Sequence, residues 1–182
     1  MKVRGAAIMH TIEFIRKKYG DRMLNEIFVT IPTILKDELE EGHKALPQSW
    51  YSFDLYEKIN RMIADKLGKG DASIIFQSAM EGGREDIERL FNKFIKDITA
   101  DNMMNFLPKI YEYYYDFGKA SCKKEADGMY TVIISDVDNY PIFFERCCTY
   151  FLGIIRNTGA PGAEVKFDYI EPLRKVVYTV LF

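Results

Sequence analysis

The dominant spacing of apolar residues changes at Gly118, and this change limits the fold more than any other feature. Before Gly118 apolar residues recur every three or four positions, as on one face of an α-helix. After it they alternate with polar residues, as in a strand with one buried face. The sequence therefore predicts a single α+β domain over residues 1–182, with a helical part over about 1–118 and a sheet part over about 119–182.

The first half of the helical part has clear breaks. A first helix is predicted to end near Gly20, and a second short helix follows over residues 23–28. Residues 30–52 hold two prolines and an acidic run, which indicates a loop with one helical turn at most. The helical period then returns at Asp54, which has the character of an N-cap.

Three more predictions concern the second half of the helical part. Gly82-Gly83 is predicted to end a helix, because paired glycines favour a helix stop. Residues 87–98 form the cleanest amphipathic stripe in the chain. A short helical segment is predicted over 102–107 with Asp101 as its cap, and Pro108 is predicted in the first turn of a new helix.

The sheet part is predicted to be a small antiparallel sheet with one inserted helix. Strands at 121–125 and 129–135 flank an Asp-Gly turn, which is a strong hairpin signal. A helix that opens at Pro141 separates this hairpin from two further strands, at 165–169 and 174–182.

Composition excludes several kinds of protein. The chain has only two histidines, too few for a three-histidine zinc site, and no nucleophile–base pair stands out, so we expect no enzymatic activity. Its 25 basic and 27 acidic side chains nearly cancel, which predicts no nucleic-acid partner. Three cysteines without a C-x-x-C spacing indicate a reduced, cytoplasmic protein, and no apolar segment is long enough for membrane insertion.

Several polar or reactive residues have a structural reading beside a functional one. Asp136 and Asp138 offer oxygens to a cation, but a solvated turn is the better interpretation. The acidic run over residues 37–41 is interpreted as a charged surface loop rather than a site for a basic partner. Cys147 and Cys148 lie on an apolar helix face, where packing is the default role.

An aromatic run is the most distinctive local feature: Tyr111, Tyr113, Tyr114, Tyr115 and Phe117. On a helix these side chains cannot all face inward. Tyr111 and Tyr114 are expected to face the core, with Tyr115 as a third candidate, and Tyr113 to point elsewhere. Two interpretations remain open: a cavity wall with polar handles, or an aromatic core that continues into a subunit interface.

Two short motifs carry a family resemblance. Asn105-Phe106-Leu107 and the later Tyr150-Phe151-Leu152-Gly153, together with the chain length, resemble the haem-nitric-oxide/oxygen-binding (H-NOX) domains. In general plan the chain is also similar to the 4-vinyl reductase and TRAPP-type domains. The segment over residues 46–51 looks like part of an uncharacterised bacterial family abundant in myxobacteria. The resemblance implies an H-NOX-like fold.

The same resemblance allows the haem-binding positions to be checked. The family's proximal histidine follows the Asn-Phe-Leu run by seven residues, and here that position is Tyr114. Its Tyr-x-Ser-x-Arg motif, which grips the haem propionates, aligns with Pro141, Phe143 and Glu145. An acid in place of the arginine would repel the propionates. A shift of one residue would instead bring Arg146 near the arginine position.

The leading hypothesis is a haem-independent sensory domain that binds a small apolar or aromatic molecule, or a signalling protein. Its pocket candidates share positions on the aromatic run and the later apolar helix: Tyr111, Tyr114, Phe117, Phe144, Cys148 and Phe151. A second hypothesis is a scaffolding module that acts by homodimerisation and partner docking. The third is a haem gas sensor whose iron ligand is Tyr114 or His10, or the lone His43 of the loop.

Overall fold

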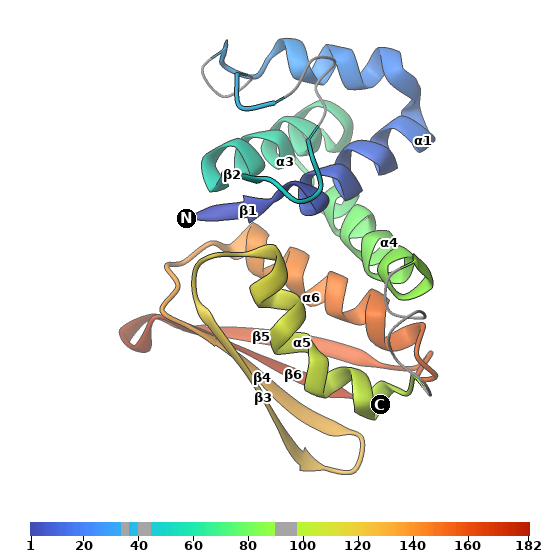
Figure 1. Ribbon diagram of the computed structural model, residues 1–182, viewed down its shortest axis with the longest axis vertical. Helices are drawn as coiled ribbons and strands as arrows, with labels where there is room; N and C mark the ends of the chain where they lie inside the picture. The colour runs from blue at the N-terminus through green and yellow to red at the C-terminus, as the bar shows by residue number, and fades with distance from the viewer. Residues whose placement is uncertain (34–36, 40–44, 90–97) are drawn as a thin grey trace. The chain divides into compact units, whose positions relative to one another are not determined.

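The computed structural model describes residues 1–33, 37–39, 45–89 and 98–182 (Figure 1). The chain forms two compact units. Unit 1 contains Met1–Ser78 and Tyr114–Asp116, and unit 2 contains Ala79–Tyr113 and Phe117–Phe182. Both units are therefore assembled from two separate stretches of sequence. None of the described helices combines the length and apolar character needed to cross a bilayer.

Unit 1 begins with a small two-stranded sheet that the sequence did not predict. Strands β1 (Lys2–Arg4) and β2 (Trp50–Ser52) run antiparallel, with Val3 opposite Tyr51. The prediction of a loop with one helical turn at most over residues 30–52 is therefore wrong at β2. Strands of three residues carry too little alternation to be recognised in a sequence. In addition, the two strands that pair here lie almost fifty residues apart.

Helix α1 (Gly5–Val29) confirms the predicted break at Gly20. It is helical on both sides of that residue, whose φ of 80° and ψ of 168° lie outside the helical region. Glycine accepts a positive φ without the penalty that a Cβ imposes. One face of α1 packs against helix α3 (Phe53–Gly68) through buried Ile8, Ile12 and Ile15.

Two helix starts in unit 1 are set by side-chain oxygens. Ser52, and not the predicted Asp54, caps α3, because its hydroxyl accepts a 3.2 Å hydrogen bond from the Leu55 backbone N–H. Helix α4 (Ser73–Arg89) follows Asp71, whose carboxylate accepts a 2.8 Å hydrogen bond from the Ser73 N–H. Both bonds satisfy backbone donors that a helix start leaves open.

The predicted helix stop at Gly82-Gly83 is wrong. Helix α4 continues through both glycines to Arg89, because Gly83 serves a close crossing with helix α6 (Pro141–Arg156). A Cβ on Gly83 would lie 2.5 Å from the Tyr150 carbonyl oxygen, and one on Gly153 would lie 2.2 Å from the Met80 carbonyl oxygen. The two glycines therefore let two helix backbones approach. Beyond Arg89, most of the predicted 87–98 stripe lies outside the described residues.

Helix α5 (Ala100–Tyr114) is one continuous helix, so the predicted break before Pro108 is wrong. A proline inside a helix removes one backbone hydrogen bond and crowds the preceding turn. Here the helix around it is held by packing, since Met103, Met104 and Leu107 are all fully buried. Burial of three large apolar side chains exceeds the proline penalty of about 3 kcal/mol.

Unit 2 contains the predicted antiparallel sheet. Its strands are β3 (Lys119–Ala126), β4 (Met129–Ser135), β5 (Glu164–Ile170) and β6 (Lys175–Leu181), in the spatial order β3-β4-β6-β5. Helix α6 lies between the two hairpins in sequence, as predicted, and runs along one face of the sheet (Figure 1). The mixed α+β fold class and the inserted helix are confirmed.

The sheet has one buried face, set by strict alternation. On β4 the buried residues are Tyr130, Val132 and Ile134, and on β6 they are Val176, Tyr178 and Val180. The register places these two sets directly opposite each other, Val132 against Tyr178 at the centre. This face forms the core of unit 2 and positions the aromatic residues described next.

Candidate ligand site

Helix α6 supplies three of the six pocket candidates. Phe144, Cys148 and Phe151 are four and three positions apart and therefore share one helix face. All three are buried. The Phe144 ring stacks on Tyr169 of β5 at 5.4 Å between centroids, and the Phe151 ring meets Tyr178 of β6 edge-on at 5.2 Å.

Tyr111 and Phe117 come from the last turns of α5 and the segment before β3. Their rings meet edge-on at 6.5 Å, and Phe117 lies 5.7 Å from the ring of Phe143 on α6. Gly118 between Phe117 and β3 has a φ of 70°, and a Cβ there would lie 3.0 Å from the Tyr111 hydroxyl. The glycine thus lets the chain turn tightly against the Tyr111 phenol.

Five of the six candidates therefore belong to one group of side chains in unit 2. We call the group the aromatic cluster, and its members are Tyr111, Phe117, Phe143, Phe144, Cys148, Phe151, Phe167, Tyr169 and Tyr178. Sequence reasoning missed the strand members. Tyr178 lies at the centre of the last alternating strand, on its apolar face, and this position in the pattern could have identified it as a cluster member.

Two polar groups of the cluster, the Tyr178 hydroxyl and the Cys148 thiol, are held uncharged. Burial raises the pKa of Tyr178 well above its usual value, and its hydroxyl donates a 3.3 Å hydrogen bond to the Phe144 carbonyl oxygen. Burial, with a contribution from Glu145, raises the pKa of the Cys148 thiol to about 12. The thiol therefore lacks the thiolate character that nucleophilic chemistry requires. The Cys148 thiol likewise donates its proton, to the Val165 carbonyl oxygen at 3.3 Å. Both groups can therefore offer a ligand only their acceptor lone pairs, and they have no acid–base role near neutral pH.

Tyr114, the sixth candidate, belongs to unit 1. Its ring lies 5.9 Å from the His10 ring and 6.3 Å from Tyr115, which in turn meets Tyr56 edge-on at 6.5 Å. Tyr114 and Tyr115 are buried while Tyr113 is half-buried, as the helix geometry predicts. The aromatic run thus contributes to both units, and His10 lies beside the position that the resemblance assigns to the iron ligand.

Most of the residues at the haem positions do not fit haem. Pro141 opens α6 and has no backbone N–H to offer a propionate. Phe143 is fully buried against Phe117, and Glu145 carries the same negative charge as a propionate. Of these aligned positions, Tyr114 alone was assigned to the iron, and its phenol is a group that can ligate ferric iron.

A one-residue shift brings Arg146 to the arginine position. Arg146 is only 2% exposed and already interacts with other groups of the chain. With this shift the tyrosine and serine positions of the motif fall on Ile142 and Phe144, whose side chains offer no hydrogen bond to a propionate, so Arg146 alone does not restore the clamp.

The remaining candidate residues have structural partners or lie outside the described residues. Asp136 is 3.5 Å from the Lys119 ammonium, and Asp138 is 2.8 Å from the Arg174 guanidinium, as in a solvated, ion-paired turn. Within the acidic run, Glu38 accepts a 2.7 Å hydrogen bond from the Ser52 N–H. His43 lies outside the described residues. The described part of the chain brings together no group of three His, Cys, Asp or Glu side chains suited to a metal ion.

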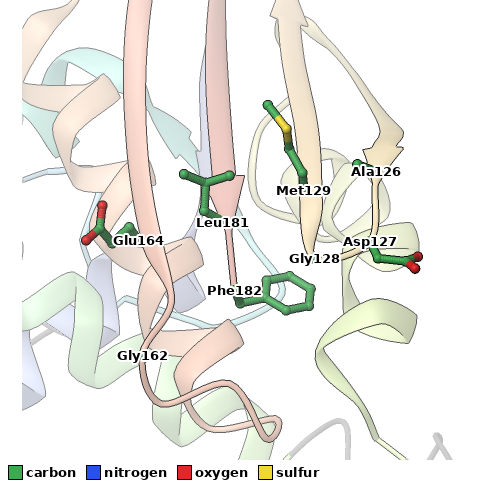
Figure 2. A pocket seen from close by; sticks show the side chains of 8 residues that line it. All are labelled: Ala126, Asp127, Gly128, Met129, Gly162, Glu164, Leu181 and Phe182. Carbon is green, nitrogen blue, oxygen red and sulfur yellow. The ribbon is translucent and has the colours of Figure 1, made fainter.

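A shallow surface hollow of about 570 Å³ lies at one end of the sheet of unit 2. Its lining residues come from the β3–β4 turn, the start of β5 and the C-terminus: Ala126, Asp127, Gly128, Met129, Gly162, Glu164, Leu181 and Phe182. Figure 2 shows the Phe182 ring beside the Asp127-Gly128 turn. None of the six pocket candidates lines this hollow.

Comparison by sequence finds no matching family profile and no matching curated protein. Comparison of structures finds clear likenesses. The Fe(II) unliganded H-NOX protein from K. algicida is 12% identical, with 98% of this chain and 95% of that chain covered and a TM-score of 0.68. A second solved structure, described under modulating haem redox potential through protein-induced porphyrin distortion, is 14% identical to this chain. The match covers 98% of this chain and 99% of that chain, with a TM-score of 0.65.

A third structure is a Cs H-NOX protein that carries the unnatural amino acid 4-cyano-L-phenylalanine. It is 16% identical, with 98% of this chain and 96% of that chain covered and a TM-score of 0.63. At such identities the likeness is one of fold, and fold does not determine chemistry. Because nearly all of each chain is matched, the predicted resemblance is confirmed: the chain has the H-NOX-like fold over almost its whole length.

Proposed function

We propose that this chain is a haem-independent, non-catalytic sensory domain, located in the cytoplasm, that binds a small apolar or aromatic molecule or a signalling protein. The observation that carries the proposal is a mismatch between fold and residues. The fold is that of the H-NOX structures, but a proline, a buried phenylalanine and a glutamate stand at the positions that the resemblance assigns to the propionate clamp. A domain of this fold without its clamp needs another ligand to act as a sensor.

The aromatic cluster supports an apolar or aromatic ligand. Its rings contact one another at centroid distances of 5.2–6.5 Å in tilted, edge-on and stacked pairs, so a ligand ring has to displace one of them to enter the cluster. Phe117 is only half-buried and is the member through which we propose entry. The uncharged Tyr178 hydroxyl and Cys148 thiol provide polar handles without an ionic preference.

Absorption spectroscopy tests haem independence. We expect protein expressed or reconstituted with excess haem to show no Soret band after gel filtration, because Glu145 repels the propionates. Native mass spectrometry of the same freshly purified protein then reports any small molecule that it retains. A Soret band of stoichiometric intensity that Tyr114→Phe abolishes would establish the haem gas sensor instead.

A thermal-shift experiment with toluene and indole as probes tests whether the chain binds a small apolar or aromatic molecule. We expect both probes to raise the unfolding midpoint, since a molecule that binds only the folded state stabilises it. Phe117→Leu should reduce this rise, whereas the matched change Phe14→Leu in unit 1 should leave it unchanged. If neither probe shifts the midpoint and native mass spectrometry finds no retained molecule, the small-ligand proposal fails.

A scaffolding module that acts by dimerisation is the second candidate. The observation that favours it is the regular outer edge of β5, which among the described residues pairs only with β6. A homodimer is compatible with either role.

A further inference from the structure

We propose that two copies of this chain associate through β5, antiparallel and about a two-fold axis at Phe167, so that two four-stranded sheets join into one. The inference rests on the edge strands of unit 2 and not on any ligand. Its failure therefore leaves the ligand-binding proposal untouched.

The two edges of the sheet differ in how they are protected. Native proteins block edge strands with lysines, prolines and bulges, because an exposed edge recruits other strands. Edge strand β3 follows this rule: it carries Lys119, Lys123 and Lys124, and its register with β4 shifts between Lys124 and Ala126. This edge is unsuited to regular pairing with another strand.

Edge strand β5 lacks these protections. All seven of its residues, Glu164 to Ile170, pair with β6 in unbroken register, and the strand contains no proline and a single lysine. Among the described residues no other strand pairs with it. It is therefore a regular edge of ordinary strand length, which is the form that β-augmentation uses.

The sequence of β5 is self-complementary in one register. Antiparallel pairing about Phe167 places Lys166 of each copy opposite Asp168 of the other and gives two opposite-charge pairs. A two-fold axis at Lys166 or at Asp168 would instead place that charge opposite its own copy. Since side chains must stay on the same face, these are the only alternative registers near the strand centre. Charge thus selects the axis at Phe167.

The charges on β5 are not neutralised by the neighbouring strand. Lys166 lies opposite Thr179 of β6, and Asp168 lies opposite Val177. Lys166 is 3.6 Å from Glu164 on its own strand, while Asp168 forms no ion pair within the described residues. A second copy would supply a cation to Asp168 and would keep Lys166 between two carboxylates.

The inward-facing row of β5 favours the same partner. Val165, Phe167 and Tyr169 are half-buried, although they face the same side as the fully buried Tyr178 of β6. Pairing about Phe167 places the two Phe167 rings against each other and Val165 opposite Tyr169. Aromatic and β-branched cross-strand pairs of this kind stabilise antiparallel sheets. The interface is isologous, as in most homodimers.

Charge exchange on β5 tests the interface by sedimentation equilibrium across a dilution series. We expect the wild-type chain to dimerise. Lys166→Asp places two carboxylate pairs in opposition, and Asp168→Lys places two ammonium pairs in opposition, so each should raise the dimer dissociation constant about tenfold or more. The double variant, Lys166→Asp with Asp168→Lys, restores both opposite-charge pairs and should restore wild-type association.

Lys123→Asp on edge strand β3 is the matched control, since it makes the same charge change at an exposed position outside the interface. It should leave the dissociation constant unchanged, and all variants should keep the wild-type circular dichroism spectrum. The proposal is overturned if the wild-type chain is monomeric throughout, if the single variants associate as well as wild type, or if the double variant does not recover association.

Discussion

At the scale of single residues, the glycines that matter most are those that no local pattern explains. Gly83 and Gly153 lie inside helices, where glycine costs about 1 kcal/mol relative to alanine. The helices keep them because a Cβ at either position would lie 2.5 Å or less from a carbonyl oxygen of the other helix. The adjacent pair Gly82-Gly83 predicts a helix stop when only local sequence is considered. The contact partners of Gly83 lie about seventy residues further along the chain, so the local pattern does not reveal the helix crossing.

The first prediction is that Gly83→Ala and Gly153→Ala each lower the free energy of unfolding by about 2 kcal/mol. Overpacking against backbone costs about 1–3 kcal/mol or more and exceeds the gain of about 1 kcal/mol in helix propensity. Urea denaturation measures the change. Gly162→Ala is the matched control, because a Cβ there has nothing within 4 Å, and it should be nearly neutral. Equal effects of all three changes would contradict the close crossing.

At the scale of elements, side-chain pairs fix helices against strands. Asp101, in the first turn of α5, accepts a hydrogen bond from the Tyr130 hydroxyl on β4 and lies 3.3 Å from the Lys124 ammonium. The bond from Tyr130, followed by that from Lys124, lowers the pKa of Asp101, while burial and Asp101 raise the pKa of Tyr130. Asp101 was expected only as a helix cap, since its strand partners are non-local.

The second prediction concerns acid stability. The pKa of Asp101 is lower in the folded state than its unfolded-state value of 3.8, so its ionised carboxylate stabilises the fold above pH 3.8. This contribution is lost as the pH falls through the lower folded-state pKa. Tyr130→Phe removes the main cause, so we expect a loss of about 1 kcal/mol at neutral pH and a smaller loss in acid, where the pH has fallen below the folded-state pKa of Asp101. Tyr169→Phe is the control: its hydroxyl donates to the Val137 carbonyl oxygen, so its cost should not depend on acid. A pH-independent cost for Tyr130→Phe would contradict the coupling.

At the scale of the whole molecule, the order of the helices and of the strands in the four-stranded sheet was largely readable from the sequence, whereas β1, β2 and the division into units were not. Periods of 3.6 and 2 are local properties, so they predicted the helices, both hairpins and the inserted helix. The return of Tyr114–Asp116 to unit 1 depends on pairing with the first strand, where Tyr115 bridges to Val3. For this reason the six pocket candidates, treated as one set, are divided between two units.

This connectivity predicts cooperative unfolding. Unit 1 loses buried Tyr114 and Tyr115 if the stretch that joins α5 to β3 is released, and α4 begins in one unit and ends in the other. We therefore expect one unfolding midpoint from Trp50 fluorescence, which reports on unit 1, and from hydrogen exchange of β4 and β6 amides in unit 2. Tyr115→Ala should lower both midpoints together, whereas Tyr113→Ala, at a half-buried neighbour, should lower them much less. If the folding of the two units is coupled, releasing the shared segment from unit 1 must also lower the unfolding midpoint of unit 2. Two separate midpoints, or a fall in the Trp50 midpoint alone, would therefore show that the units unfold independently.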